Sequence, residues 1–211
     1  MKKLASTLPN MCLSLMITCA ASGIILAGAN RFTAEPIALS KAAALEKAVK
    51  DVTPEFDNDP LAEAYKGVTA DGDSLLIYPA QKDGQAVGVA VDSYTKNGFG
   101  GEIKIIVGFD TEGTLINYAV LQHAETPGLG SKMDVWFRTD KNKQNVIGRS
   151  LAKGNLSVTK DGGEVDAITA STITSRAFLH AINRAYSAYK GTSDATTSAT
   201  TSTSTEGGND Q

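Results

Sequence analysis

The chain has 211 residues, of which 42% are apolar and 20% are charged. That composition supports one packed domain with appendages and excludes a wholly disordered chain. A formal net charge of -3 argues against a nucleic-acid-binding protein, which usually carries a basic face. The cysteines, Cys12 and Cys19, both lie near the N-terminus, and the chain has 2 histidines. Disulfides and cysteine-ligated metal centres are therefore excluded after Cys19, and no metal site is expected.

A long uncharged segment follows Lys2 and Lys3 and reaches residue 30. Its most apolar part, residues 11–29, would span about 28 Å as a helix, which is close to the hydrocarbon thickness of a bilayer. The two lysines before it predict a cytoplasmic N-terminus, residues 1–10, and a chain that continues on the extracytoplasmic (periplasmic) side of the inner membrane. The sequence thus predicts a single-pass membrane anchor.

Two other interpretations of this segment stay open. Residues 27–29, Ala-Gly-Ala, have the small-x-small pattern of a cleavage site, so the segment is alternatively a cleaved signal peptide. A lipid-modified Cys19 fits less well, because the preceding Met-Ile-Thr lacks the small residue expected next to such a cysteine. The anchor and the signal peptide both place the body of the protein outside the cytoplasm.

Residues 30–73 are expected to form an extracytoplasmic helix and a linker. Ser40 has the character of an N-cap for a helix that continues to about Val52 with one apolar face. Residues 51–60, with two prolines and several acids, indicate a connection.

Strand patterns begin after this linker. Apolar alternation and β-branched residues predict four strands, at residues 74–78, 86–94, 102–109 and 114–122. The sequence Asp-Thr-Glu-Gly between the last two is a hairpin turn signal. We therefore expect an antiparallel sheet.

Helical patterns dominate the rest of the domain. Residues 131–137 are expected to form a short helix, and residues 155–159 a further short strand. An apolar stripe over residues 172–190, followed by glycine, predicts a final helix. An antiparallel sheet with helices near both ends makes residues 74–190 an α+β domain.

The C-terminal residues, 191–211, differ from the rest in composition. They hold seven threonines and four serines and lack any large apolar residue. Such a segment cannot bury apolar surface, so a disordered, solvated tail is expected.

One glycine-rich segment, residues 123–130, directly follows a predicted strand and reads His-Ala-Glu-Thr-Pro-Gly-Leu-Gly. Its proline and glycines make a tight, exposed backbone whose amides can closely approach a planar ligand. Glu125 and Thr126 add an acceptor and a hydroxyl near the same place. An ordinary loop is the simpler interpretation, and His123 alone is more typical of a packed or surface histidine.

A second segment, residues 166–175, leads into the final helix and reads Asp-Ala-Ile-Thr-Ala-Ser-Thr-Ile-Thr-Ser. Its hydroxyl residues fit helix capping, which composition alone favours. A helix N-terminus also exposes unpaired amides and a positive dipole end, which suit a phosphate. A threonine hydroxyl there could contact a phosphate or carry one as an ester.

Together these segments resemble the FMN-binding domain family. Residues 166–172, Asp-x-x-Thr-Ala-Ser-Thr, resemble its flavin-attachment motif, acid-x-x-Ser/Thr-Gly/Ala-Ala/Ser-Thr. Residues 123–130 resemble its His-x-Glu-Thr-Pro-Gly-x-Gly element, and residues 98–101, Gly-Phe-Gly-Gly, fit its glycine-rich pattern. With the N-terminal anchor and the Ser-Arg-Ala-Phe continuation, about residues 5–190 resemble the G subunit of Rnf electron-transport complexes.

The resemblance implies that FMN is bound covalently, through a phosphoester to Thr172. Asp166 would be the motif acid recognised by a flavin transferase. The other implied site residues form two groups. Those expected along the flavin are Glu125, Thr126, Leu129 and Gly130. Those expected to shape the attachment turn are Thr169, Ala170 and Ser171. Ala170 and Ser171 stand where the family commonly has glycine and alanine, and both are small enough for a phosphate to approach.

The implied function is that of a membrane-anchored flavoprotein subunit. It would carry electrons in a complex that couples ferredoxin and NAD redox chemistry to ion translocation, and would not be a stand-alone catalyst. The implied partners are other membrane and iron–sulfur subunits, a flavin transferase and the lipid bilayer, with no nucleic acid. One alternative is the C subunit of a sodium-pumping NADH:quinone reductase, whose chains are typically longer. Another is a non-redox extracytoplasmic binding module of the same fold.

Overall fold

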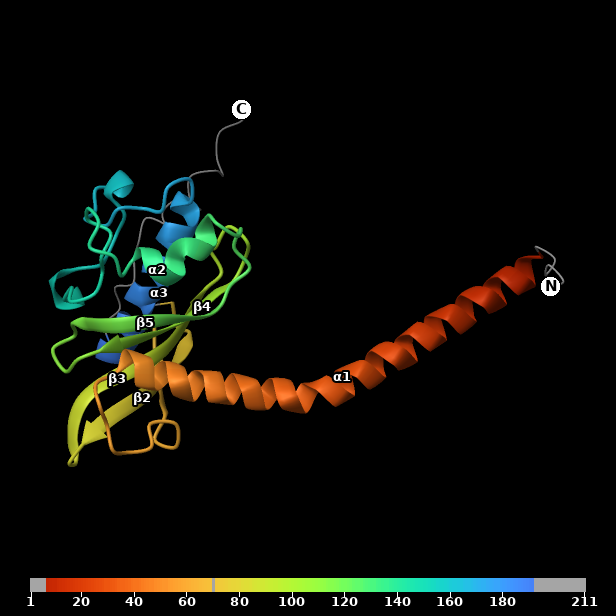
Figure 1. The fold of residues 1–211 in the computed structure, drawn as a ribbon, viewed down its shortest axis with the longest axis horizontal. Helices are drawn as coiled ribbons and strands as arrows, with labels where there is room; N and C mark the ends of the chain where they lie inside the picture. The colour runs from red at the N-terminus through yellow and green to blue at the C-terminus, as the bar shows by residue number, and fades with distance from the viewer. Residues whose placement is uncertain (1–6, 70, 192–211) are drawn as a thin grey trace. The chain divides into compact units, whose positions relative to one another are not determined.

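The computed structural model describes residues 7–69 and 71–191, so the predicted tail lies outside the described part except for Gly191. The chain divides into two compact units, up to Ala44 and from Leu45 onward (Figure 1). The first unit is most of α1 (Leu8–Val52), which among the described residues is the helix long and apolar enough to cross a membrane.

The separate helix predicted to begin at Ser40 is wrong, because α1 runs through that residue without a break. Residues 31–39 contain no glycine, and the proline inside α1, Pro36, removes one backbone donor while the residues around it remain helix-compatible.

The second unit is built on a five-stranded antiparallel sheet in which each strand pairs with its neighbour in the chain. The strands are β1 (Tyr65–Val68), β2 (Ser74–Lys82), β3 (Gln85–Thr95), β4 (Ile103–Phe109) and β5 (Leu115–Gln122). The four predicted strands are confirmed, with β2 extending further than expected. The α+β fold class is confirmed as well.

The edge strand β1 was not predicted. It is short and contains Gly67, which weakens any strand pattern. The structure explains this glycine, because a Cβ at Gly67 would lie 2.7 Å from the carbonyl oxygen of Ala188 on α3 (Thr172–Lys190). The close packing of α3 against β1 therefore requires glycine here, and this contact cannot be read from the local sequence.

The sheet is covered on both faces. This double coverage explains why the sequence of β4 is almost continuously apolar. Ile105 and Val107 join the larger core, which packs against α3. Ile106 belongs to a smaller core on the opposite face, which contains Val49 and Val52 from the last turns of α1. Both helices are therefore held to the sheet by apolar burial.

The segment between β5 and α3 is mostly irregular. It contains the 3-10 helices η1 (Gly130–Lys132), η2 (Leu151–Lys153) and η3 (Thr159–Asp161) and the short helix α2 (Met133–Trp136). The short helix predicted at 131–137 is thus observed as η1 followed by α2.

The strand predicted at residues 155–159 is wrong. Leu156 is buried, but its backbone bonds to a side chain and not to a neighbouring strand. Its N–H donates to Asn183 Oδ1 at 2.9 Å, and its carbonyl accepts from Asn183 Nδ2 at 2.9 Å. The one bridge near this segment joins Val158 to Val165.

Candidate functional site

The two glycine- and hydroxyl-rich segments meet at a cavity of about 370 Å³, within the size range of small-molecule sites. Its walls come from the β3–β4 loop, the loop after β5 and the start of α3. The lining residues are Phe99, Thr126, Leu129, Ala170, Ser171, Thr172, Ile173 and Thr174. Five of the nine predicted site residues therefore share one cavity, whereas Glu125, Gly130, Asp166 and Thr169 do not line it.

Glu125 points inward and joins three segments. Its side chain is 5% exposed. Oε1 accepts a hydrogen bond from the Gly100 N–H at 3.0 Å, and Oε2 accepts one from the Thr174 hydroxyl at 2.6 Å. Both carboxylate oxygens are thus used within the protein, and Glu125 fixes the β3–β4 loop and α3 around the cavity.

Gly130 supports the same arrangement. A Cβ at this position would lie 2.5 Å from Glu125 Oε2 and 2.8 Å from Thr174 Oγ1. His123 holds the backbone of Glu125, because its Nδ1 accepts a hydrogen bond from the Glu125 N–H at 3.2 Å. Both residues therefore shape the wall through Glu125.

The turn before α3 explains one motif position. Ala170 has φ of +60°, in the left-handed region that favours glycine, and this accounts for the glycine common there in the FMN-binding family. Ser171 is the N-cap residue of α3 but makes no side-chain cap hydrogen bond. The amides in the first turn of a helix lack acceptors within the helix, so these donors remain for an anion.

The hydroxyl groups of this turn differ in what surrounds them. Thr174 and Ser175 are buried, and Ser175 Oγ donates to the Ser171 carbonyl oxygen at 2.9 Å. Thr169 is exposed but does not line the cavity. Thr172 is half-buried, lines the cavity, and its Oγ1 accepts a hydrogen bond from Lys160 Nζ at 3.1 Å.

Asp166 braces the segment that precedes the turn. Its Oδ2 accepts from the Lys143 N–H at 3.1 Å, and its Oδ1 from the Thr159 hydroxyl at 3.2 Å. Its carbonyl oxygen accepts from Trp136 Nε1 at 2.9 Å. Asp166 therefore has a structural task in the folded chain.

The cavity is lined by apolar and hydroxyl side chains. None of the residues that line it carries a titratable side chain. Shifted titrations occur elsewhere: burial raises the pKa of Tyr118 to about 12, and its hydroxyl donates to the Met133 carbonyl oxygen at 2.7 Å. Charged groups stand behind this lining, where Glu125 accepts a hydrogen bond from Thr174 and Lys160 donates one to Thr172.

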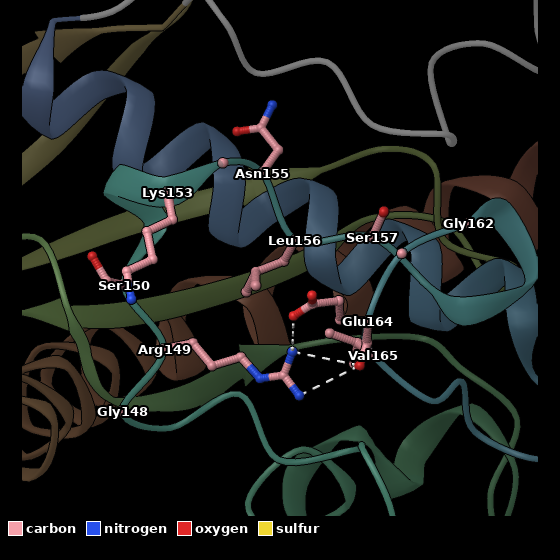
Figure 2. A pocket seen from close by; sticks show the side chains of 12 residues that line it. Gly148, Arg149, Ser150, Lys153, Asn155, Leu156, Ser157, Gly162, Glu164 and Val165 are labelled. Carbon is pink, nitrogen blue, oxygen red and sulfur yellow. Dashed lines mark hydrogen bonds and ion pairs between the residues drawn. The ribbon is translucent and has the colours of Figure 1, made fainter.

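A larger cavity of about 530 Å³ lies among residues 148–165 (Figure 2). One of its charged residues, Arg149, is bonded to protein oxygens. Nε donates to the Asn145 carbonyl at 2.7 Å, and Nη2 donates to the Lys143 carbonyl at 3.1 Å. The guanidinium also pairs with the Glu164 carboxylate at 3.7 Å. No predicted site residue lines this cavity.

Comparison with known proteins agrees with this geometry. The family model of the FMN-binding domain matches residues 98–187, which include both motifs and the cavity. The G subunit of the ion-translocating oxidoreductase complex of Vibrio vulnificus (strain YJ016) is 37% identical over 177 residues, 79% of this chain and 82% of that protein. The protein of the same name from Stutzerimonas stutzeri is 36% identical over 178 residues, 82% of this chain and 77% of that protein.

The chain belongs to the family of G subunits of ion-translocating oxidoreductase complexes. The resemblance expected from the motifs is thereby confirmed. A further member from Vibrio cholerae serotype O1 (strain M66-2) is 34% identical over 178 residues, 81% of this chain and 84% of that protein. This chain has one helix of spanning length among its described residues, which fits a membrane-anchored protein.

The sequence did not predict a site role for four residues that the structure places there. Phe99 is 69% exposed and Ile173 is 50% exposed, and both line the cavity. An aromatic residue among glycines in a loop is a usable signal for Phe99. Thr174 and Lys160 carry no comparable signal, because their contacts to Glu125 and Thr172 depend on the fold.

Proposed function

We propose that this chain carries electrons within an ion-translocating oxidoreductase through FMN that is covalently attached to Thr172. The single observation that supports this most is the cavity at the start of α3, where both motifs of the FMN-binding domain meet. When bound, FMN would supply reversible one- and two-electron redox chemistry. The absence of titratable residues from the cavity lining fits a site that holds a redox group.

Attachment at Thr172 is supported by a comparison of neighbouring hydroxyls. Thr174 donates to Glu125 and is 0% exposed, so its oxygen is not accessible to a flavin phosphate. Ser175 is 0% exposed as well. Thr172 is half-buried and lines the cavity. Ser171 is also half-buried and lines the cavity. The match to the attachment motif therefore selects Thr172, which lies at the helix N-terminus, where the dipole stabilises a phosphate.

The attachment reaction needs an activated flavin phosphate. In our proposal, Thr172 Oγ1 would give its proton to a base of the transferase and bond to the flavin-side phosphorus of a flavin dinucleotide. The pyrophosphate bond breaks, and a nucleoside monophosphate leaves. A flavin transferase would catalyse this step and recognise the segment that begins at Asp166.

The apolar walls of the cavity would hold the flavin ring. Phe99 and Ile173 present exposed apolar surface at the cavity, and Leu129 is 39% exposed beside them. Aromatic and aliphatic side chains of this kind favour a planar heterocycle over water. Glu125 and Gly130 would act indirectly, by fixing the loop that carries Leu129.

We further propose that α1 anchors the chain with its N-terminus in the cytoplasm and the FMN-binding domain on the extracytoplasmic side of the inner membrane. The charge asymmetry between Lys2, Lys3 and the first later charge, Arg31, supports this orientation. Covalent attachment suits that side, where a dissociated flavin would be lost. Other membrane and iron–sulfur subunits of the complex would be the electron-transfer partners, coupling ferredoxin and NAD chemistry to ion movement.

The test is Thr172→Ala, produced with an active flavin transferase. We expect complete loss of the ultraviolet-excited flavin band on a denaturing gel, with normal folding and membrane insertion. Thr111→Ala, which removes an exposed hydroxyl in the β4–β5 turn, is the matched control and should keep the band. A band that survives Thr172→Ala, or an adduct mapped to Thr174 by peptide mass, would refute the attachment site. Wild-type protein without a band would favour a non-redox binding module.

A further inference from the structure

Lys160 lies beside the oxygen proposed to carry FMN. It belongs to η3 and is exposed. Its Nζ donates a hydrogen bond to Thr172 Oγ1 at 3.1 Å, across twelve residues of sequence. Among the residues that the structure describes, no salt bridge pairs Lys160 with a carboxylate. Its positive charge is thus placed at this hydroxyl without an anionic partner from the described part of the protein.

The residues on either side of Lys160 are fixed. Thr159 donates its hydroxyl to Asp166 Oδ1 at 3.2 Å. Asp161 forms a two-point ion pair with Arg176 on α3, with distances of 2.8 Å and 2.6 Å. This hydrogen-bonded pairing with Asp161 raises the pKa of Arg176. Lys160 is therefore held near the first turn of α3 by both of its chain neighbours.

We propose that Lys160 binds the phosphate of the attached FMN. This proposal rests on the attachment of FMN to Thr172. A phosphodiester at Thr172 carries one negative charge, and its non-bridging oxygens lie two bonds from Oγ1, the atom that Lys160 Nζ already contacts. The ammonium group has three donors, so it can bind a non-bridging oxygen with a charge-assisted hydrogen bond. The Asp161–Arg176 pair is the positioning element for this contact.

The deciding measurement uses the flavin-loaded, detergent-solubilised full chain. Phosphorus-31 NMR reports the phosphodiester directly, through its hydrogen bonds and local geometry. We expect Lys160→Gln to shift the phosphodiester resonance, and Lys160→Arg, which keeps the charge, to leave it close to the wild-type position. Lys153→Gln, on η2, removes a lysine of the same segment and should leave the resonance unchanged.

A second measurement covers variants that load poorly. Flavin loading is followed after a short pulse of expression together with the transferase. A single charge-assisted hydrogen bond of about 1.4 kcal/mol corresponds to roughly a tenfold change, so we expect Lys160→Gln to load about tenfold more slowly. Lys160→Glu should be slower still and Lys160→Arg near wild type, an order that follows charge and not side-chain shape.

The outcomes separate this inference from the proposed function. If Lys160→Gln loads normally and its resonance is unshifted, Lys160 does not bind the phosphate, while attachment at Thr172 stands. If Lys160→Gln loads nothing and Lys160→Arg fails equally despite native unfolding curves, the charge has no role and the inference fails. If wild-type protein carries no flavin, the proposed function itself is wrong.

Discussion

Glu125 shows at the scale of one residue how a motif position can shape a cavity that it does not line. In the motif it stands beside Thr126, and the resemblance implies a flavin contact for both. In the folded chain the Thr126 position lines the cavity, whereas Glu125 is buried and bonded to Gly100 and Thr174. A buried carboxylate is stable when its oxygens are hydrogen-bonded, as both are here.

His180 is a second buried polar residue, and its titration leads to a prediction. Its ring on α3 is 5% exposed, and Nδ1 lies 3.1 Å from Thr95 Oγ1. Burial, and secondly the nearby Arg184 charge, lower the pKa of His180 below 6.5, while Asp71 opposes the shift. The histidine is therefore kept neutral in the folded protein.

The lowered pKa makes stability depend on pH. Between the folded pKa of His180 and 6.5, the unfolded chain binds more protons than the folded chain. The free energy of unfolding should thus be highest above pH 6.5 and fall as the pH drops below that value. Urea unfolding of the solubilised chain from about pH 7.5 to about pH 5.5 measures this, with His180→Asn as the comparison. The raised pKa of Asp92 also makes stability depend on pH, but it does so equally in both proteins and cancels in the comparison. Equal slopes for the two proteins would contradict the assignment.

At the scale of elements, the end of α1 docks closely on β4 and β5. A Cβ at Gly108 on β4 would overlap the carbonyl oxygen of Val52. Gly108 pairs across the sheet with Asn117, whose Nδ2 donates to the Asp51 carbonyl oxygen at 2.8 Å. The last turn of α1 can thus reach the sheet because Gly108 has no side chain and Asn117 supplies a hydrogen-bonding amide.

Substitution at these two positions should weaken this docking. We expect Gly108→Ala to lower the free energy of unfolding by about 1–3 kcal/mol, because the added methyl forces the helix from the sheet. Asn117→Ala should cost about 1 kcal/mol through the lost hydrogen bond. Thr111→Ala, on an exposed turn, should stay within about 0.5 kcal/mol of wild type in the same denaturation experiment. A Gly108→Ala protein as stable as wild type would show that α1 has room to move.

At the scale of the whole molecule, an apolar helix and an FMN-binding domain are joined in one chain. The first unit consists mainly of α1, whose apolar side chains are exposed, as expected for a segment that contacts lipid. The second unit has its own core and the cavity. This division agrees with an anchored carrier whose redox group is held in a separate folded unit.

The orientation across the membrane is open to a direct test. A reporter that is active only outside the cytoplasm, fused after Lys190, should be active, because the positive-inside rule predicts that the lysines before the anchor stay in the cytoplasm. The same reporter fused before residue 8 should be inactive. Intact mass of the purified chain then distinguishes a retained anchor from a signal peptide cleaved after Ala29. An inactive first fusion together with an active second fusion would overturn the proposed localisation.

The sequence alone determined the features that depend on local pattern. Alternation of apolar residues predicted the strands β2 to β5, and the stripe over residues 172–190 predicted α3. The spacing of apolar residues follows the period of each element, so such patterns survive without knowledge of the fold. The motifs at residues 123–130 and 166–172 likewise identified the family, because the residues of each motif are adjacent in the chain.

Only the tertiary structure decided which groups face one another. The inward turn of Glu125 depends on Thr174, 49 residues away, and the irregular path at Leu156 depends on Asn183, 27 residues away. The burial of Thr174 and Ser175 among the hydroxyls at the start of α3 is likewise set by packing and cannot be read from the local sequence. Contacts between distant residues form only when the chain packs, and they set which oxygen and which charge a ligand can reach.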